Sequence, residues 1–298
     1  MTRGRATRIG FLAVLMWALL ALLTLGTAPV PPFLLNALCF GLGGGAGAIW
    51  LTVTGGWGAL RRVPWQVYGF GTLGLFGYHA VYFTALRLAD ATGSAAEASL
   101  LAYLWPLFIV LLSGLLPGER LRPQHLAGAA LALAGAALIV LKDGVRLDAA
   151  ALPALGLAFG CAVIWAVYSV ASRYLGQVPT AAVVVYCLAT AALSVPVHLA
   201  LEPTLWPVGV WGWGAVFGLG VGPVGLAFFV WDVGMKKGDI QLLAVASYAA
   251  PLLSTACLVL AGRAEPTASL LLAAGLITGG AALAARAGPK SVTPATGA

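Results

Sequence analysis

Long apolar runs separated by short polar or basic segments recur along the whole chain. An apolar run of roughly 20 residues is long enough to cross a hydrocarbon core about 30 Å thick as an α-helix. Strand-type alternation of apolar and polar positions is absent, which disfavours a β-barrel. The pattern predicts an all-α integral membrane protein with ten transmembrane helices, at residues 9–26, 33–53, 66–87, 94–116, 124–141, 152–174, 179–200, 209–231, 240–261 and 268–285.

Composition and charge strengthen this interpretation. Hydrophobic residues make up 61% of the 298 residues, the mean hydropathy is +0.98 and only 8% of residues are charged, against about a quarter in soluble domains. Of the 16 Lys and Arg residues, only Arg87, Lys142, Arg146 and Arg263 fall on the side opposite the N-terminus. Because Lys and Arg concentrate in cytoplasmic loops, both termini are expected in the cytoplasm. The formal charge of +7 needs no nucleic-acid partner, since the basic residues form no stripe.

An internal repeat divides the chain into two similar halves. The sequence Tyr-x-x-Pro-Leu occurs at 103–107 and again at 248–252, 145 residues later (248 minus 103), and Gly-Ala-Ala-Leu recurs at the same offset. The predicted halves, 1–148 and 149–287, each hold five helices and are followed by a flexible tail at 288–298. Because five is odd, the second half is inverted relative to the first. Many secondary transporters have this plan, with a substrate site near the midplane, so the repeat predicts alternating access around a central cavity.

Each copy of the repeated motif places a proline inside a predicted helix. Proline cannot donate a backbone N–H and clashes with the preceding turn, so Pro106 and Pro251 are expected to kink their helices. The kinks would free the carbonyl groups of Ala102 and Ser247, which in hydrocarbon need neighbouring groups or cavity water as partners. We interpret the two prolines as hinges beside a partly wet cavity. The alternative, that each proline only shapes a packed helix, stays open.

Aromatic and polar side chains gather in the first, third, fourth, sixth, eighth and ninth predicted helices, where exposure to lipid would be unfavourable. An aromatic wall with a few polar groups suits a flat, partly apolar ligand. Ordinary helix packing is the alternative for each of these side chains, and the almost purely aliphatic fifth and tenth helices are predicted to be scaffold. The candidate substrate-binding residues are Trp17, Tyr78, His79, Tyr82, Tyr103, Trp105, Trp165, Tyr168 and Tyr248.

Three ionisable residues within or next to the predicted helices are candidates for more specific roles. His79 lies in the middle of a helix, where an imidazole can hydrogen-bond a carboxylate or carry a proton, although a structural histidine is an equal alternative. Glu97 and Asp232 lie near the predicted membrane boundaries and are candidate gate charges. Snorkelling or helix-end roles compete with that assignment.

The sequence gives no sign of an enzyme. The glycine-rich segment at 41–47 lies inside an apolar helix without the preceding strand that a dinucleotide site requires, so close helix contacts explain it better. A Walker motif, a nucleophile elbow and a metal-ligand cluster are absent from the sequence. We therefore expect no catalytic residue, cofactor or metal. The expected partners are a small-molecule substrate and the lipid bilayer, and a monomer is the default.

Three segments resemble a known family. They are "AEASLLAYLWPLF" at 96–108, "VIWAVYSVASRYL" at 163–175 and "WDVGMKKGDIQLLAVASYAAPLLS" at 231–254. With the ten helices and the repeat, they resemble the EamA-type members of the drug/metabolite transporter superfamily, and among these the bacterial exporters of aromatic amino acids. The resemblance covers nearly the whole chain. His79 departs from the pattern, because some members are expected to have an acidic residue there.

The resemblance carries expectations about function and location. It implies a basket of ten helices in the bacterial inner membrane that exports aromatic and other neutral amino acids from the cytoplasm. It also implies that Trp17, Tyr78, Tyr82, Tyr103, Trp105, Trp165 and Tyr248 line the central cavity. The alternative function is broader efflux of amphipathic drugs or metabolites, which would require acidic groups in the cavity if the substrates were cations.

Overall fold

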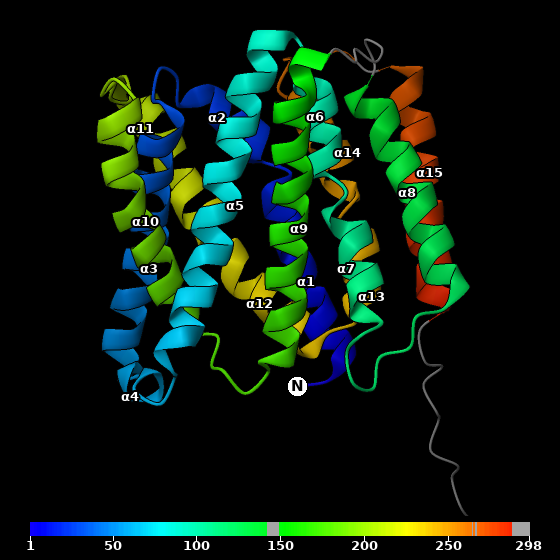
Figure 1. Ribbon diagram of the computed structural model, residues 1–298, viewed down its shortest axis with the longest axis horizontal. Coiled ribbons are helices and arrows are strands. Elements are labelled where there is room, and N and C mark those ends of the chain that lie inside the picture. Colours follow the sequence, from blue (N-terminus) through cyan, green and yellow to red (C-terminus); the bar gives the residue numbers. More distant parts are fainter. Residues whose placement is uncertain (142–148, 264, 266, 288–298) are drawn as a thin grey trace, which may run out of the picture.

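A computed structural model describes residues 1–141, 149–263, 265 and 267–287, and all regular secondary structure in these residues is helical (Figure 1). The first half contains α1 (Arg3–Trp17), α2 (Leu20–Gly26), α3 (Pro32–Thr54), α4 (Trp57–Leu60), α5 (Trp65–Thr92), α6 (Ala95–Ala102), α7 (Trp105–Ser113) and α8 (Pro123–Val140). The second half contains η1 (Ala149–Ala151), α9 (Leu152–Tyr174), α10 (Ala182–Leu201), α11 (Gly209–Val221), η2 (Gly222–Leu226), α12 (Ala227–Lys237), α13 (Ile240–Ala246), α14 (Ala249–Leu260) and α15 (Ala268–Arg286).

The helices have the length and composition of membrane-spanning segments. Within the described residues, nine helical segments are long and apolar enough to cross a bilayer. The remaining predicted span, the third, is α5, whose 28 residues are also long enough, but whose Gly, Tyr and His residues lower its mean hydropathy. Large apolar side chains such as Val53, Trp211 and Leu260 are 81 to 90% exposed on the outside of the bundle. A lipid environment accounts for this exposure, since water would disfavour it.

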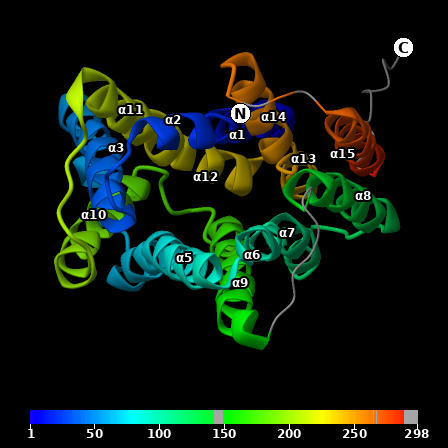
Figure 2. The same ribbon diagram turned by 90° about the horizontal axis from the view of Figure 1, so that it is seen from above.

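Helix packing shows the relation between the two halves. The second spans of the halves pair with each other, α3 with α10, and the fifth spans pair likewise, α8 with α15. The third span of each half packs on the first span of the other, α5 on α9 and α12 on α1, so exchanging the halves preserves the pairing (Figure 2). In Figure 1, α8 starts at the end of the bundle where α15 finishes. The two five-helix repeats are therefore inverted relative to each other.

Small residues allow the closest of these contacts. A Cβ atom added to Gly128 of α8 would lie 2.5 Å from the carbonyl oxygen of Gly280 in α15, and the reverse distance is also 2.5 Å. Gly43, within the glycine-rich segment of α3, meets the backbone of Gly225 and Gly220 equally closely. These contacts leave no room for a side chain. They confirm that the segment at 41–47 serves helix packing.

At the prolines of the fourth and ninth spans, the helix is interrupted for two residues whose backbone angles stay close to helical values. The fourth span is interrupted between α6 and α7 and the ninth between α13 and α14, so Pro106 and Pro251 lie in the first turns of α7 and α14. Proline is tolerated there because those N–H groups lack helical partners in any case. The prediction that the carbonyl of Ser247 is left free is wrong, because the N–H of Ala250 donates to it at 3.0 Å.

Two further interruptions were not predicted from the sequence. The first span breaks between α1 and α2 at Ala18 and Leu19, and the π-turn η2 interrupts the eighth span, which continues through α12 to Lys237 rather than ending at residue 231. All four interrupted spans therefore belong to the six helices expected to line the cavity. Interrupted helices expose backbone groups where a ligand can reach them.

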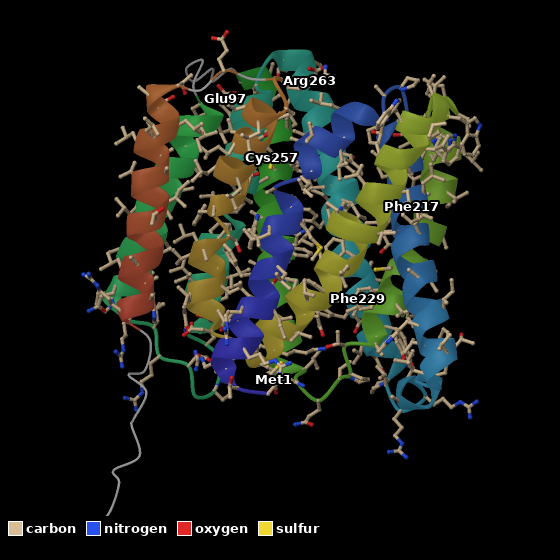
Figure 3. The ribbon with its side chains drawn as sticks, turned by 180° about the vertical axis from the view of Figure 1, so that it is seen from behind. Met1, Glu97, Phe217, Phe229, Cys257 and Arg263 are labelled. Atoms are coloured by element: carbon tan, nitrogen blue, oxygen red, sulfur yellow. The ribbon has the colours of Figure 1, made fainter. Side chains whose placement is uncertain are left out.

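The two ends of the bundle differ. The N-terminus and the end of α15 lie at one end, here called the terminal end, and the opposite end is called the far end (Figures 1 and 3). Arg263 and Glu97 lie at the far end, while Met1 lies at the terminal end. Of the four basic residues expected opposite the N-terminus, Lys142 and Arg146 lie outside the described residues. The predicted boundary at 148 and the tail at 288–298 lie outside them as well.

Candidate functional site

Four tryptophans from four different spans meet in the middle of the bundle. They are Trp17, Trp105, Trp165 and Trp231, here called the tryptophan cluster, and each contacts all three others. Ring centroids lie 5.1 to 6.4 Å apart, mostly in edge-to-face or tilted geometry, which aromatic quadrupoles favour. Trp17 and Trp165, which correspond in the repeat, are in direct contact at 6.0 Å. The cluster therefore lies where the two halves meet.

Hydrogen bonds fix two of these rings and leave two available. The indole N–H of Trp17 donates to the carbonyl of Pro223 in the π-turn at 3.1 Å, and that of Trp231 donates to the hydroxyl of Ser169 at 3.1 Å. The indole N–H groups of Trp105 and Trp165 make no hydrogen bond within the described part of the chain and are not among its buried unpartnered atoms. Both groups can therefore donate to a ligand.

Two tyrosines of α5 extend this aromatic surface toward the far end. The rings of Tyr78 and Tyr82 stack at 5.9 Å, and Tyr78 also contacts Trp165 at 5.2 Å. Tyr103, at the break between α6 and α7, lies near both rings. All three side chains are partly exposed. Each therefore keeps some surface that the protein does not cover.

His79 has one ring nitrogen fixed and one available. Its Nδ1 lies 2.7 Å from the carbonyl oxygen of Leu75, and because a carbonyl only accepts, Nδ1 must carry a proton. The ring meets the edges or faces of Phe40, Tyr78 and Phe228 at 4.9 to 6.0 Å. The Nε2 atom has no partner among the described residues. In the neutral ring it presents a hydrogen-bond acceptor toward the interior.

The repeated tyrosines occupy different environments. Tyr248 is fully buried, and its hydroxyl accepts a hydrogen bond of 3.2 Å from the backbone N–H of Leu107. That N–H belongs to the first turn of α7, where helical partners are absent. The hydroxyl of Tyr103, the related residue, makes no hydrogen bond within the described part of the chain. Tyr248 of the second half therefore caps α7 of the first half, whereas Tyr103 of the first half makes no corresponding hydrogen bond to α14.

Tyr168 is more deeply buried than Tyr78, Tyr82 and Tyr103. It packs against Phe70 at 6.3 Å and fits over Gly74 of α5, and it is 3% exposed. It also contacts Trp165 at 5.3 Å, so it supports the tryptophan cluster from the terminal side. Tyr168 also lines a cavity of about 10 Å³ together with Tyr186 and Asp232. This cavity has room for about one water molecule.

The two candidate gate charges are both buried, at opposite ends of the bundle. Asp232 is 2% exposed, accepts hydrogen bonds from Thr180 at 2.6 Å and Lys236 at 2.8 Å, and is neutralised by that lysine. Glu97 is 6% exposed in the first turn of α6, where the helix dipole favours a negative charge. Neither carboxylate belongs to the tryptophan cluster.

A charge network that was not predicted from the sequence closes the terminal end. Glu119, between α7 and α8, forms ion pairs with Arg3 of α1, at 3.1 Å, and with Arg173 of α9. Arg173 also donates to the carbonyls of Met235 and Gly238 at the end of α12. These contacts join both halves. Short basic loops were the only sequence signal, and they do not indicate which charges pair.

The aromatic set from the sequence also omitted two phenylalanines. Phe40 of α3 and Phe228 of α12 stack on each other at 5.4 Å, and Phe228 contacts three members of the site at 5.7 to 6.4 Å. Phenylalanine in an apolar helix is typical of lipid-facing and buried positions alike, as Phe217, 60% exposed, illustrates. The sequence alone does not distinguish a lipid-facing phenylalanine from a buried one.

The two halves also match one protein family separately. The model of the EamA-like transporter family matches residues 7–141 and again residues 152–286. The chain belongs to the EamA-like transporter family. Its two matched segments coincide with the two inverted five-helix repeats, so this transporter carries two copies of the family's helical unit.

Several relatives of this transporter have a printed function. It is 53% identical over 286 residues to the aromatic amino acid exporter YddG of Ancylobacter novellus, covering 95% of this chain and 98% of that protein. The aromatic amino acid exporter YddG of Escherichia coli is 29% identical over 301 residues, covering 95% of this chain and 97% of that protein. A crystal structure that is 52% identical superposes with a TM-score of 0.90 over 97% of this chain and 100% of that one. The fold of this EamA-like transporter is therefore that of a solved protein.

Proposed function

We propose that this EamA-like transporter exports aromatic amino acids, and other neutral amino acids, from the cytoplasm by alternating access. The relatives named as aromatic amino acid exporters support this function. The single structural observation that carries it is the convergence of the tryptophan cluster with Tyr78, Tyr82 and His79 at the centre of two inverted repeats. Flat aromatic side chains bind such surfaces through edge and stacking contacts.

The polar groups around this surface match the head group of an amino acid. Nε2 of His79 accepts a hydrogen bond from the substrate's ammonium group, and the indole N–H groups of Trp105 and Trp165 donate to its carboxylate. The hydroxyls of Tyr78 and Tyr103 supply further donors or acceptors. The substrate's side chain then lies along the stacked tyrosines. Few charged groups are involved, which fits a zwitterion with no net charge.

The closed terminal end defines the transport state. Because positive charge concentrates at that end, we assign it to the cytoplasm, with both termini inside and the protein in the bacterial inner membrane. We then take the described state to be the one closed to the cytoplasm by the Glu119 network. Opening of the Glu119 network and rotation about the breaks beside Pro106 and Pro251 convert it to the opposite state. Since one chain holds both repeats, we take the monomer as the transporting unit.

Release of labelled tryptophan from liposomes containing the purified protein tests this function. We expect release by the wild type, and at least a tenfold loss in Trp165→Ala, because that ring contacts every other member of the tryptophan cluster. Trp211→Ala is the matched control, since Trp211 is 90% exposed to lipid. Absence of release in the wild type, or equal loss in both variants, would contradict the proposal.

The same assay addresses proton coupling and the broader substrate range. If His79 only accepts a hydrogen bond, an imposed pH gradient leaves release unchanged and His79→Gln weakens substrate binding. Efflux of amphipathic cations is less well supported, because the carboxylate of Asp232 is already neutralised by Lys236. Competition by an amphipathic cation stronger than that by tyrosine would favour the broader efflux function.

A further inference from the structure

A second cavity lies at the terminal end, remote from the tryptophan cluster. Its volume is about 120 Å³. Its walls come from α1, the connection between α7 and α8, the start of α8, α13 and the end of α15. Its polar lining includes Arg3, Arg120, Arg122, His125 and Gln241, together with the carboxylates of Glu119 and Asp239. Both halves of the transporter contribute to it.

Several hydrogen-bond donors of this cavity are unused. Gln241 is 2% exposed, and neither its side-chain nitrogen nor the Nε atom of Arg3 has a hydrogen-bond partner among the described residues. Nδ1 of His125 accepts from the backbone N–H of Arg122 at 3.2 Å, so the ring proton is on Nε2. That N–H has no partner within the described part of the chain either. Buried polar groups of folded proteins nearly always have partners, so the buried, unpartnered donors of Gln241 and Arg3, together with the unused Nε2–H of His125, indicate a ligand that accepts hydrogen bonds.

The charges of the lining favour an anion. Glu119 is neutralised by Arg3 and Arg173, and Asp239 accepts from the backbone N–H of Leu242 at 3.0 Å and lies 3.5 Å from Arg3. The guanidinium groups of Arg120 and Arg122 form no ion pair among the described residues. The acids are thus occupied while positive charge and donors remain. Arginine and amide donors are the groups that recognise carboxylate and phosphate oxygens.

We propose that this cavity binds a small oxyanion, a carboxylate or phosphate group, through Arg3, Gln241 and His125, and that its occupancy favours the state closed at the terminal end. These three residues lie on α1, α13 and α8, so one anion connects helices that must separate when this end opens. A ligand that binds one state better shifts the equilibrium toward that state. The binding step is independent of the proposed export function, and only the coupling to opening rests on it.

Titration of purified protein in neutral detergent with inorganic phosphate, followed by calorimetry, tests the binding step. We expect one saturable site in the wild type that chloride does not replace, and at least tenfold weaker binding in Gln241→Met, which removes the donors at similar volume. Gln66→Met is the matched control, because Gln66 is exposed at the start of α5 at the same end of the bundle. Absence of saturable binding, or equal affinity in Gln241→Met and the wild type, would overturn the site.

Two further measurements provide a second test of the site and identify the source of the oxyanion. Arg3→Lys keeps the positive charge but removes the Nε donor, so it should also weaken phosphate binding. If Gln241→Met does not fold, the phosphate affinity of Arg3→Lys tests the site in its place. In lipid nanodiscs, a lower phosphate affinity with phosphatidylglycerol than with phosphatidylcholine would identify a lipid head group as the natural oxyanion. Equal affinity in the two would identify a free anion.

The coupling step has its own readout. Phosphate should slow maleimide labelling of a cysteine placed at Ala244, which is fully buried in α13, and should not slow it in Gln241→Met. Phosphate binding without slower labelling would overturn the coupling and leave the site. Failure of tryptophan release, in contrast, would contradict the export function and leave the phosphate titration unaffected.

Discussion

Tyr248→Phe removes one hydroxyl and tests how the terminal end is held closed. The hydroxyl accepts the N–H of Leu107 in the first turn of α7, and the ring of Tyr248 is fully buried. Phenylalanine fills nearly the same volume, so the packing of α7 against α13 is retained. The N–H of Leu107 then loses its acceptor. We expect this to destabilise the closed state by about 1 to 2 kcal/mol, within the range for a lost helix cap or hydrogen bond.

This magnitude fixes the expected change in population. If the bond exists only in the closed state, a loss of about 1 to 2 kcal/mol raises the open fraction by a factor of about 5 to 30. The rate of labelling by a water-soluble maleimide is proportional to the open fraction when labelling is slower than closing of the terminal end. The probe is a cysteine introduced at Ala244 in a background without Cys39, Cys161, Cys187 and Cys257. Labelling should accelerate by the same factor.

A matched control separates the lost hydrogen bond from the loss of a hydroxyl in general. Tyr174→Phe makes the same chemical change at the terminal end of α9, where Tyr174 is 75% exposed. It should leave the labelling rate unchanged. Labelling of Tyr248→Phe at the wild-type rate would show that this bond does not distinguish the two states, and the reasoning from it would be refuted.

Three other predictions address packing, the charge network and the helix breaks. Gly280→Ala places a methyl group 2.5 Å from a backbone oxygen of Gly128 and should cost about 1 to 3 kcal/mol, measured as a lower midpoint of thermal unfolding in detergent. Gly275→Ala, with open space at that position of the same helix, should not lower the midpoint, and equal loss in both would contradict the packing argument. Glu119→Gln removes the charge shared by two arginines, so the terminal end should open more readily. Tryptophan counterflow should accelerate if opening limits its rate, and labelling at the Ala244 probe should accelerate in either case; no change in labelling would contradict this role of Glu119. Pro106→Ala allows α6 and α7 to join into one helix, so turnover should fall more than KM rises, and the reverse pattern would exclude a hinge at this break.

Some features of the fold follow directly from the sequence. The ten spans follow from run length, and nine of the ten predicted starts lie within three residues of an observed helix start, because apolar runs end where the lipid ends. The breaks in the fourth and ninth spans follow from Pro106 and Pro251. The break after Trp17 has no comparable signal, since neither Pro nor Gly occurs at Ala18 or Leu19. Tertiary contacts of the two adjoining helices must hold that break.

Part of the candidate site could likewise be predicted from the sequence, and part could not. Trp and Tyr in the middle of a span are costly in lipid, so three members of the tryptophan cluster and the tyrosines of α5 could be selected from sequence. Trp231, the last residue of its predicted span, is missing from the predicted binding set. Phe40 and Phe228 carry no such cost. The pairing of Glu119 with Arg3 and Arg173 joins residues 116 and 54 positions apart, and loop charges give no information about partners at that separation. The role of Gln241 depends on what its amide fails to contact, which only a folded structure reveals.

The inverted repeat predicts that Tyr103 and Tyr248 exchange roles during transport. In the described state Tyr248 is buried against α7, whereas Tyr103 is partly exposed and its hydroxyl has no hydrogen-bond partner among the described residues. Because the two halves have the same motif in opposite orientation, Tyr103 should pack against α14 when the far end closes and the terminal end opens. Tyr103→Phe should then destabilise that opposite state, so labelling at the Ala244 probe should become slower, opposite in sign to the effect of Tyr248→Phe. Faster labelling, or the wild-type rate, would mean that the two tyrosines do not exchange and that Tyr103 acts only on the substrate.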